Sequence, residues 1–409
     1  MTLFSKLLYS SRNLTVIFMT IVAQILFSCS DDEVIPKPDD HEFLVDATLI
    51  STPTAAEIKF LAQFSGLGLD INEFKYDVDL YKITYHTMFR GSEVMGSGLV
   101  GLPKTDDAVG MLSFQHGTIV KQDEAPSNLS ATDPNTLLYG SLASSGFIGV
   151  VPDFLGFGAS SAILHPYYVE EYTASAVIDM LKAARELADE NNVQFNERLF
   201  LAGYSEGGYA TMATHKAIEQ HDLVGFELIA SFAGAGAYDI KEMQSYMFDL
   251  VSYDDPYYLA YIAIAYQLTF DFSSILTDFF KEPYASAIPS LFDGSKSAGE
   301  INAQLTTTIG DLIQEGIVAN IDTDPTYAYL VDAFDENSLT DWVPTVRLYL
   351  YHGESDTTVP FENSEVTYTK LIDNGASSDV ISLTPLAGTH STALEPYLVD
   401  FVTKLWDLR

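Results

Sequence analysis

The chain has 409 residues, of which 47% are hydrophobic, so it is long enough to bury a large core. Its formal net charge is −37 at pH 7. Such an excess of acidic groups repels the phosphates of nucleic acids, and we therefore expect no nucleic-acid partner.

The chain begins with a leader pattern. A basic, polar start is followed by an apolar run over 14–27 that is too short for a comfortable membrane span, and then by Leu26-Phe27-Ser28-Cys29. This pattern resembles a bacterial lipoprotein signal, which implies cleavage before Cys29 and lipid attachment to its sulfur. We predict a signal peptide over 1–28 and an acidic tether over 29–45. A plain secretory signal with a chance cysteine is the alternative.

The acidic residues directly after the cysteine are similar to the export signal of Bacteroidetes surface lipoproteins. The resemblance implies a protein of the bacterial cell envelope, anchored to the outer membrane and displayed at the cell surface. The lipid anchor is then the only membrane contact that we expect. Because Cys29 is the single cysteine, no intramolecular disulfide is possible.

The apolar pattern then predicts alternating helices and strands. A helical pattern covers 53–64, and two alternating runs at 77–90 and 94–102 predict an antiparallel hairpin at the edge of a sheet. Further strands are expected at 110–115, 147–154, 228–234, 345–352 and 380–386, and further helices at 133–145, 168–190 and 392–408.

This order of elements predicts an α/β fold in which a mostly parallel central sheet is flanked by helices. The alternation stops over 241–340, where Tyr and Phe are abundant and apolar residues occur nearly all round. We interpret this stretch as a helical cap inserted into the sheet domain. The core would then comprise 46–240 and 341–409.

One motif lies at the centre of the predicted fold. An apolar run from Leu199 leads into Gly203-x-Ser205-x-Gly207, and a helical pattern follows. This is the G-x-S-x-G arrangement of a nucleophile elbow in the strand–turn–helix context that the motif requires. The turn is so tight that side chains at the glycine positions would collide, and the serine must adopt a strained backbone conformation. We therefore predict that Ser205 is a nucleophile.

The partners of Ser205 are expected downstream, in the order acid and then base. The string His352-Gly353-x-x-Asp356-x-x-Val359-Pro360 follows one strand, and Gly388-Thr389-His390 follows the last. Both lie where an open parallel sheet places its active site. We assign Asp356 as the acid and His390 as the base. The alternatives are Glu354 as the acid and, as bases, His215, His221 or His352.

The pair His116-Gly117 follows the strand over 110–115 and is similar to the oxyanion loop of α/β-hydrolases. The resemblance implies that a backbone N–H of Thr118 or Gly117 pairs with the N–H of Glu206, the residue after the nucleophile. It also implies that His116 organises the loop and is not a base.

These motifs together resemble the α/β-hydrolase superfamily and, within it, the secretory lipase group typified by fungal lipase A. The second resemblance rests on Gly203-Tyr204-Ser205-Glu206-Gly207-Gly208, on Pro152-Asp153-x-x-Gly156-x-Gly158 with His165-Pro166-Tyr167 after it, and on the inserted region. It implies ester hydrolysis beneath a lid-like cap with an apolar acyl pocket. Asp153 and His165 are expected to be structural supports.

We therefore expect a serine carboxylic-ester hydrolase, a carboxylesterase or lipase that works through an acyl-serine intermediate on a small-molecule ester with an apolar acyl group. A serine peptidase of the prolyl-peptidase-like kind is one alternative, with Asp254-Asp255 holding a free amine. A non-catalytic surface binding lipoprotein is another. We expect no metal and no cofactor, because the sequence lacks H-E-x-x-H and a phosphate-binding glycine fingerprint, and Asp322-x-Asp324 is too sparse for a calcium loop.

Overall fold

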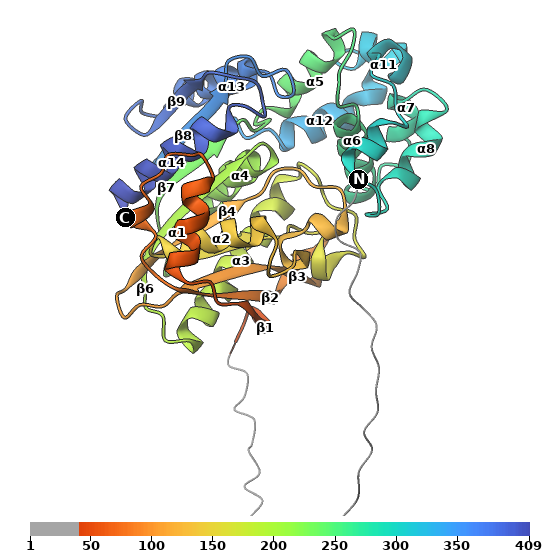
Figure 1. The fold of residues 1–409 in the computed structure, drawn as a ribbon. Helices are drawn as coiled ribbons and strands as arrows, with labels where there is room; N and C mark the ends of the chain where they lie inside the picture. The colour runs from red at the N-terminus through yellow and green to blue at the C-terminus, as the bar shows by residue number, and fades with distance from the viewer. Residues whose placement is uncertain (1–40) are drawn as a thin grey trace, which may run out of the picture. The chain divides into compact units, whose positions relative to one another are not determined.

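A nine-stranded sheet runs through the part of the chain that the computed structural model describes, residues 41–409 (Figure 1). The strand order is β1-β2-β3-β5-β4-β6-β7-β8-β9. The predictions for residues 1–40, including the signal peptide and Cys29, lie outside the described residues. The strands are β1 (Leu44–Ser51), β2 (Val78–Phe89), β3 (Ser92–Pro103), β4 (Val109–Gln115), β5 (Phe147–Pro152), β6 (Phe195–Tyr204), β7 (Glu227–Gly234), β8 (Arg347–Gly353) and β9 (Ile381–Leu386).

The mostly parallel sheet predicted from the sequence is confirmed. The strands from β5 and β4 through β9 pair in parallel, whereas β1, β2 and β3 pair antiparallel, and β3 joins β5 antiparallel. Parallel strands bring their carboxyl ends to one edge of the sheet, so the loops after β4, β6, β8 and β9 all emerge on the same side.

The expected position of the hairpin at the sheet edge is wrong, because β1 pairs with β2 and occupies that edge. This strand begins at Leu44, so the predicted tether over 29–45 runs two residues too far. The carboxylate of Glu186 anchors the start of the strand. It accepts hydrogen bonds from the backbone N–H of Glu42 at 2.9 Å, of Phe43 at 3.1 Å and of Leu44 at 2.7 Å.

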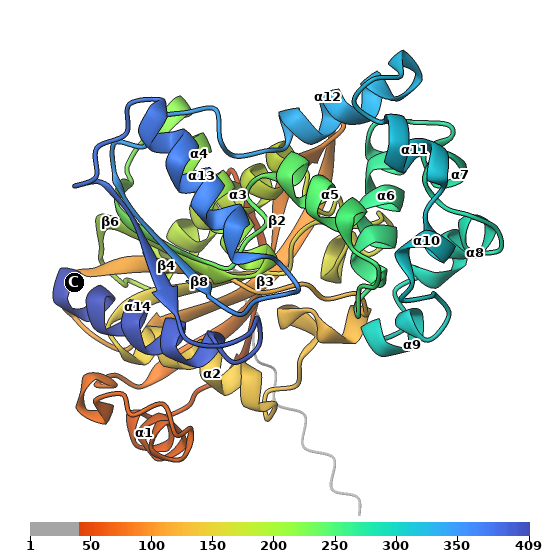
Figure 2. The ribbon, with the colours of Figure 1, turned by 90° about the horizontal axis from the view of Figure 1, so that it is seen from above.

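Helices cover both faces of the sheet (Figure 2). Helices α1 (Ala55–Phe64), α2 (Pro134–Ser144) and α14 (Leu394–Leu408) lie on one face. Helices α3 (Glu170–Glu190), α4 (Glu206–His221) and α13 (Phe361–Asp373) lie on the other. Five short 3₁₀ turns connect the described elements, at Ile71–Glu73, Gln122–Glu124, Pro126–Asn128, Gly158–Ser160 and Pro325–Tyr327.

The central strand β6 supplies side chains to both layers because successive residues of a strand point to opposite faces. Phe200 belongs to a buried cluster with Phe401 of α14. Leu199 and Leu201 belong to a second cluster with Met180 of α3. Strand β6 is thus held rigidly between two packed layers, and it ends directly at the nucleophile elbow.

Eight helices lie between β7 and β8, where the sequence predicts an inserted helical cap, and the two views show them gathered at one end of the sheet. A single buried cluster contains side chains of these helices together with core residues such as Tyr209 and Leu350. The cap helices are α5 (Ile240–Asp249), α6 (Tyr257–Thr269), α7 (Ile275–Phe279), α8 (Tyr284–Leu291), α9 (Ala298–Asn302), α10 (Ile309–Leu312), α11 (Glu315–Asn320) and α12 (Ala328–Glu336).

Across residues 41–409, none of the helices has both the length and the apolar character that a membrane crossing requires.

Candidate active site

The turn between β6 and α4 is as tight as the G-x-S-x-G motif predicts. Ser205 has φ 60° and ψ −125°, a backbone conformation that is strained for a residue with a side chain. A Cβ on Gly203 would lie 2.2 Å from the carbonyl oxygen of Gly207. One on Gly207 would lie 2.0 Å from the carbonyl oxygen of Gln115. Both positions therefore require glycine, and the turn presents the Ser205 hydroxyl at the end of the sheet.

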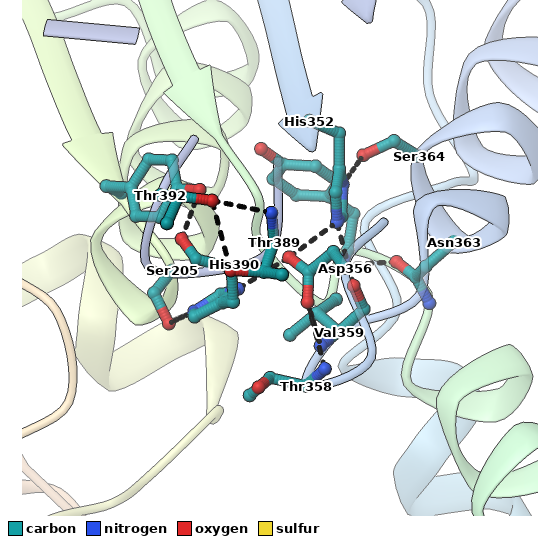
Figure 3. Close-up of polar contacts among 12 residues, drawn as sticks. Ser205, His352, Asp356, Thr358, Val359, Asn363, Ser364, Thr389, His390 and Thr392 are labelled. Atoms are coloured by element: carbon teal, nitrogen blue, oxygen red, sulfur yellow. Dashed lines mark hydrogen bonds and ion pairs between the residues drawn. The ribbon is translucent and has the colours of Figure 1, made fainter. Parts of the chain in front are cut away.

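The structure brings together Ser205, Asp356 and His390, which lie after three different strands (Figure 3). The hydroxyl of Ser205 donates to Nε2 of His390 at 2.9 Å. On the other side of the ring, Nδ1–H of His390 donates to Oδ2 of Asp356 at 2.6 Å. Because a carboxylate only accepts, this second bond fixes the tautomer that leaves Nε2 free to take the serine proton.

The acid of this arrangement is buried yet ionised. Burial alone would raise the pKa of Asp356, but hydrogen bonds from His352 and His390 lower it to about 2. The other oxygen, Oδ1, accepts from the backbone N–H of Thr358 at 2.9 Å and of Val359 at 3.0 Å. The charged carboxylate therefore has partners on every side.

The alternatives to these residues are placed elsewhere. Glu354 is exposed. Nε2 of His352 donates to the carbonyl of Val359 at 2.8 Å and also lies 3.2 Å from Oδ2 of Asp356. His215 is buried against the hydroxyl of Ser231 at 2.8 Å. His221 lies at the far end of α4. Of the histidines weighed for the base, His390 is the one that contacts Ser205.

The loop after β4 passes directly beside Ser205. A Cβ on Gly117 would lie 3.5 Å from the carbonyl of Tyr204 and 3.7 Å from Cβ of Ser205. The Thr118 hydroxyl shares a hydrogen bond of 2.9 Å with the Tyr167 hydroxyl, which holds the loop from the other side. Glu206 is the first residue of α4, so its N–H has no partner within the helix.

His116 and Asp153, which were expected to organise or support the site, connect the loop after β4 to its neighbours. His116 turns its ring to the carbonyls of Gly117 at 2.7 Å and Asp153 at 3.3 Å. The fully buried Asp153 carboxylate accepts from the hydroxyls of Ser97 and Ser127, each at 2.5 Å. The loop after β4, the end of β5 and the Ser127 turn are therefore fixed to one another.

Sequence reasoning did not predict the partner of His165. Its Nε2 lies 2.6 Å from Oε1 of Glu206, and both side chains are only 3% exposed. The Nδ1–H of the same ring donates to the carbonyl of Leu155 at 2.6 Å. A Cβ on Gly156 would lie 2.4 Å from the backbone of His165, so the glycine allows the loop to close on the histidine. The string from Pro152 to Tyr167 marked this loop in the sequence but did not indicate the contact with Glu206.

The variable position of the elbow motif also contributes a contact that the sequence did not indicate. The hydroxyl of Tyr204 donates to the backbone carbonyl of His390 at 2.7 Å. Its ring lies against the His390 ring, with centroids 5.4 Å apart. Tyr204 thus ties the loop that carries His390 to the strand that carries Ser205.

A largely apolar cavity opens from Ser205 into the cap. The cavity has a volume of about 80 Å³. The wall comes from the loops around Ser205 and from α5, α6, α7 and α12, and none of the described residues that form it is charged. The residues that form it are Tyr167, Tyr168, Ser205, Ala237, Ile240, Met243, Gln244, Met247, Phe248, Tyr253, Tyr258, Leu259, Ile262, Ala263, Ile275, Phe279, Phe334, Thr358 and Val359.

Several solved structures are similar to this one. A candidate hydrolase from Legionella pneumophila is 28% identical with a TM-score of 0.77, over 89% of this chain and 98% of the other. A mutant of the rice cell wall degrading esterase LipA from Xanthomonas oryzae is 23% identical with a TM-score of 0.79, over 90% of this chain and 99% of the esterase chain. Candida antarctica lipase A in its closed state is 15% identical with a TM-score of 0.64, over 89% of this chain and 82% of the lipase chain. No functionally curated protein is significantly similar in sequence.

The sheet, the elbow and these likenesses define an α/β-hydrolase fold. The family model of the secretory lipases matches residues 122–393, and the chain belongs to that family. It is a hydrolase of the lipase and esterase class, and membership of a secretory family indicates a secreted protein. The resemblance to this group drawn from the sequence is therefore confirmed.

Proposed function

We propose that the chain is a serine carboxylic-ester hydrolase in which Ser205 is the nucleophile, His390 the general base and Asp356 the orienting acid. The continuous hydrogen-bond path from Ser205 through His390 to Asp356 supports this function more than any other observation. Nε2 of His390 takes the Ser205 proton as Oγ attacks the ester carbonyl, and later gives it to the leaving alkoxide. Water, activated by the same imidazole, then hydrolyses the acyl-serine.

The negative charge that develops on the ester oxygen needs hydrogen-bond donors. We assign this role to the backbone N–H of Glu206 and to a backbone N–H of the Gly117-Thr118 pair. The first lies at the N-terminus of α4, where the unpaired N–H groups and the helix dipole favour an anion. The second is in a loop packed against the nucleophile. Loss of one such donor typically costs about 3–4 kcal/mol of transition-state stabilisation.

The cavity beyond Ser205 supports an acyl group as the recognised part of the substrate. Its wall is built mainly from Met, Ile, Leu and Phe side chains of the cap helices, which solvate a hydrocarbon chain and exclude water. The insertion 241–340 would then act as the cap of the acyl site, with 44–240 and 341–409 as the core. An apolar cavity of this kind can take the acyl group of a water-soluble ester, so the substrate need not be a water-insoluble lipid.

The test compares wild type with Ser205→Ala on 4-nitrophenyl esters from acetate to long chains. We expect the variant to lose at least about 10³-fold in kcat, because the nucleophile is gone while the cavity remains. Ser355→Ala, a substitution at an exposed serine of the acid loop, is the matched control. Equal rates for wild type and Ser205→Ala would refute the proposal.

The peptidase alternative receives no support from the cavity. The carboxylate of Asp255 accepts from the side-chain amide of Asn302 at 2.9 Å, and neither Asp254 nor Asp255 lines the cavity. An amide substrate matched to each ester should therefore be cleaved far more slowly.

A non-catalytic binding lipoprotein would not need the hydrogen-bond path from Ser205 through His390 to Asp356. Covalent labelling of Ser205 by a fluorophosphonate would support the hydrolase, and a lack of labelling would support the binding lipoprotein.

We further propose that Cys29 carries a lipid and that residues 29–40 connect it to β1. Support comes from the leader pattern and from the position of the described unit, whose first strand begins at Leu44. Metabolic labelling with an alkyne-tagged fatty acid should mark the wild-type protein in the bacterial envelope fraction and leave Cys29→Ala unmarked. Equal labelling of both proteins would refute the anchor at this residue.

A further inference from the structure

One polar side chain of the cavity wall, that of Gln244, has a buried oxygen without a hydrogen-bond partner. Helix α5 presents Ile240, Met243, Gln244, Met247 and Phe248 to the cavity, at the spacing of one helix face. Four of the five are apolar. Gln244 is 8% exposed, and its Oε1 is buried without a hydrogen-bond partner.

Other polar groups of the same wall are satisfied. The Tyr167 hydroxyl bonds to Thr118 at 2.9 Å, and the Tyr253 hydroxyl donates to the carbonyl of Thr358 at 3.0 Å. Among residues 41–409, Gln244 alone combines a buried, unpaired polar side-chain atom with a place in this wall. An unpaired amide oxygen in such a site carries a free-energy cost that a hydrogen bond from a ligand group would remove.

The start of helix α5, which carries Gln244, is fixed to the core by hydrogen bonds. Helix α5 begins at Ile240, and its N-cap residue Asp239 accepts from the N–H of Glu242 at 3.0 Å. The side chain of Asn363 accepts from the N–H of Asp239 at 3.2 Å and donates to its carbonyl at 2.7 Å. Gln244 therefore lies about one helical turn beyond a buried helix start that is bonded to α13.

The chemistry of the ligand group follows from the amide and its surroundings. A hydroxyl both donates and accepts, so it pairs with a glutamine amide in either orientation. An ammonium or carboxylate group would need a counter-charge, and none of the described residues of the wall is charged. A trapped water needs two to four polar partners, whereas the stripe around Gln244 is apolar.

Building on the proposed ester hydrolysis, we infer that Gln244 is a specificity-determining residue that binds a hydroxyl group on the acyl chain. The preferred substrates are then esters of hydroxylated carboxylic acids whose chains are otherwise apolar. The apolar wall holds the hydrocarbon part, and the Gln244 amide selects the chain that carries its hydroxyl at the matching depth.

The test uses ethyl octanoate and a set of ethyl octanoates with one hydroxyl at a position from carbon 3 to carbon 8, with release of acid followed by titration. For the wild type, we expect one isomer to exceed plain ethyl octanoate by about tenfold or more in kcat/KM. In Gln244→Met, which keeps the length of the side chain and loses the amide, this ratio should fall to near one. Ser245→Ala, at an exposed position of the same helix that does not line the cavity, is the control and should keep the ratio.

Two results would overturn the inference. One is a wild type that prefers no hydroxylated isomer, and this result is decisive even where Gln244→Met does not fold. The other is a folded Gln244→Met protein with the wild-type ratio. Both are distinct from failure of the proposed function, which would appear as Ser205→Ala hydrolysing plain ethyl octanoate as fast as the wild type.

Discussion

His165 and Glu206 form a buried pair, with Nε2 of the histidine 2.6 Å from Oε1 of the glutamate. The carbonyl of Leu155 accepts from Nδ1 of the same ring, so Nε2 faces the carboxyl group and one proton lies between the two side chains. Glu206 follows the proposed nucleophile, and its backbone N–H is a proposed oxyanion donor. The pair therefore holds the first turn of α4 in position.

Removal of His165 should disturb catalysis through Glu206. In His165→Ala the carboxyl group stays buried without its partner, which typically costs about 3–5 kcal/mol of unfolding free energy. We expect kcat to fall by about tenfold or more with little change in KM, because the displaced N–H acts in the transition state and not in ground-state binding. Steady-state kinetics on a nitrophenyl ester, with urea unfolding, measure both effects.

The conservative variant Glu206→Gln tests whether the hydrogen bond to His165 matters, apart from the charge of Glu206. In Glu206→Gln the amide can donate to Nε2 of His165, so this variant should retain more kcat and stability than Glu206→Ala. Equal losses in the two Glu206 variants would show that the pair does not position the helix through its hydrogen bond.

The stability contributed by Asp356 should depend on pH. Its folded pKa, about 2, lies below its ordinary value of 3.8 despite burial, because His352 and His390 bond the carboxylate. The stabilisation is therefore fully present above about pH 4 and is lost as the pH falls through the folded pKa near 2. The shift corresponds to about 2 kcal/mol. Between pH 5 and pH 2, the gap in unfolding free energy between wild type and Asp356→Asn should shrink by this amount, whereas a constant gap would contradict the assignment.

Tyr204→Phe should weaken catalysis although Ser205, His390 and Asp356 all remain. The variant loses the hydrogen bond from the tyrosine hydroxyl to the carbonyl of His390 and keeps the ring contact. A single bond of this kind is worth about 1 kcal/mol, so kcat should fall by about fivefold. The covalent labelling rate of Ser205 by a fluorophosphonate should fall in parallel. Unchanged values of both would mean that the His390 loop is held by its other contacts.

The junction between β7 and α5 should be sensitive to substitution of Asn363. This side chain is fully buried, accepts from the N–H groups of Tyr238 and Asp239, and donates to the carbonyl of Asp239. Asn363→Ala leaves these groups unpaired, and we expect a loss of about 2–4 kcal/mol in unfolding free energy. Thermal unfolding compared with Asn374→Ala, at the exposed end of α13, checks the prediction. A loss no larger than that of the control would contradict it.

Most of the sheet could be predicted because its strands carry local signals. The central strands are continuous apolar runs, and the hairpin of β2 and β3 alternates around a turn at Gly91. Strand β1 was missed because it directly follows an acidic, proline-containing stretch and its place depends on long-range partners. Pairing with β2 and the carboxylate of Glu186, far along the chain, determine where it begins.

The residues around Ser205 likewise include some that local sequence patterns could predict and others that depend on long-range contacts. The positions of Ser205, Asp356 and His390 could be predicted because the elbow and the two loops after strands have recognisable spacing. The pairing of His165 with Glu206 could not, since it depends on a loop that turns at Phe154, with φ 65°, and at Gly156, with φ 94°. The unpaired amide of Gln244 was also not predictable, because a helical pattern alone does not indicate which face meets the cavity.

The most direct test of the central claim is the location of the acyl group during turnover. Wild-type protein is mixed with 4-nitrophenyl octanoate, quenched in acid within the first turnovers, digested and examined by mass spectrometry. We predict an octanoyl adduct on Ser205 in the wild type and no adduct at this position in Ser205→Ala, which should also be inactive. Octanoyl transfer to a different residue, or wild-type turnover by Ser205→Ala, would contradict the account.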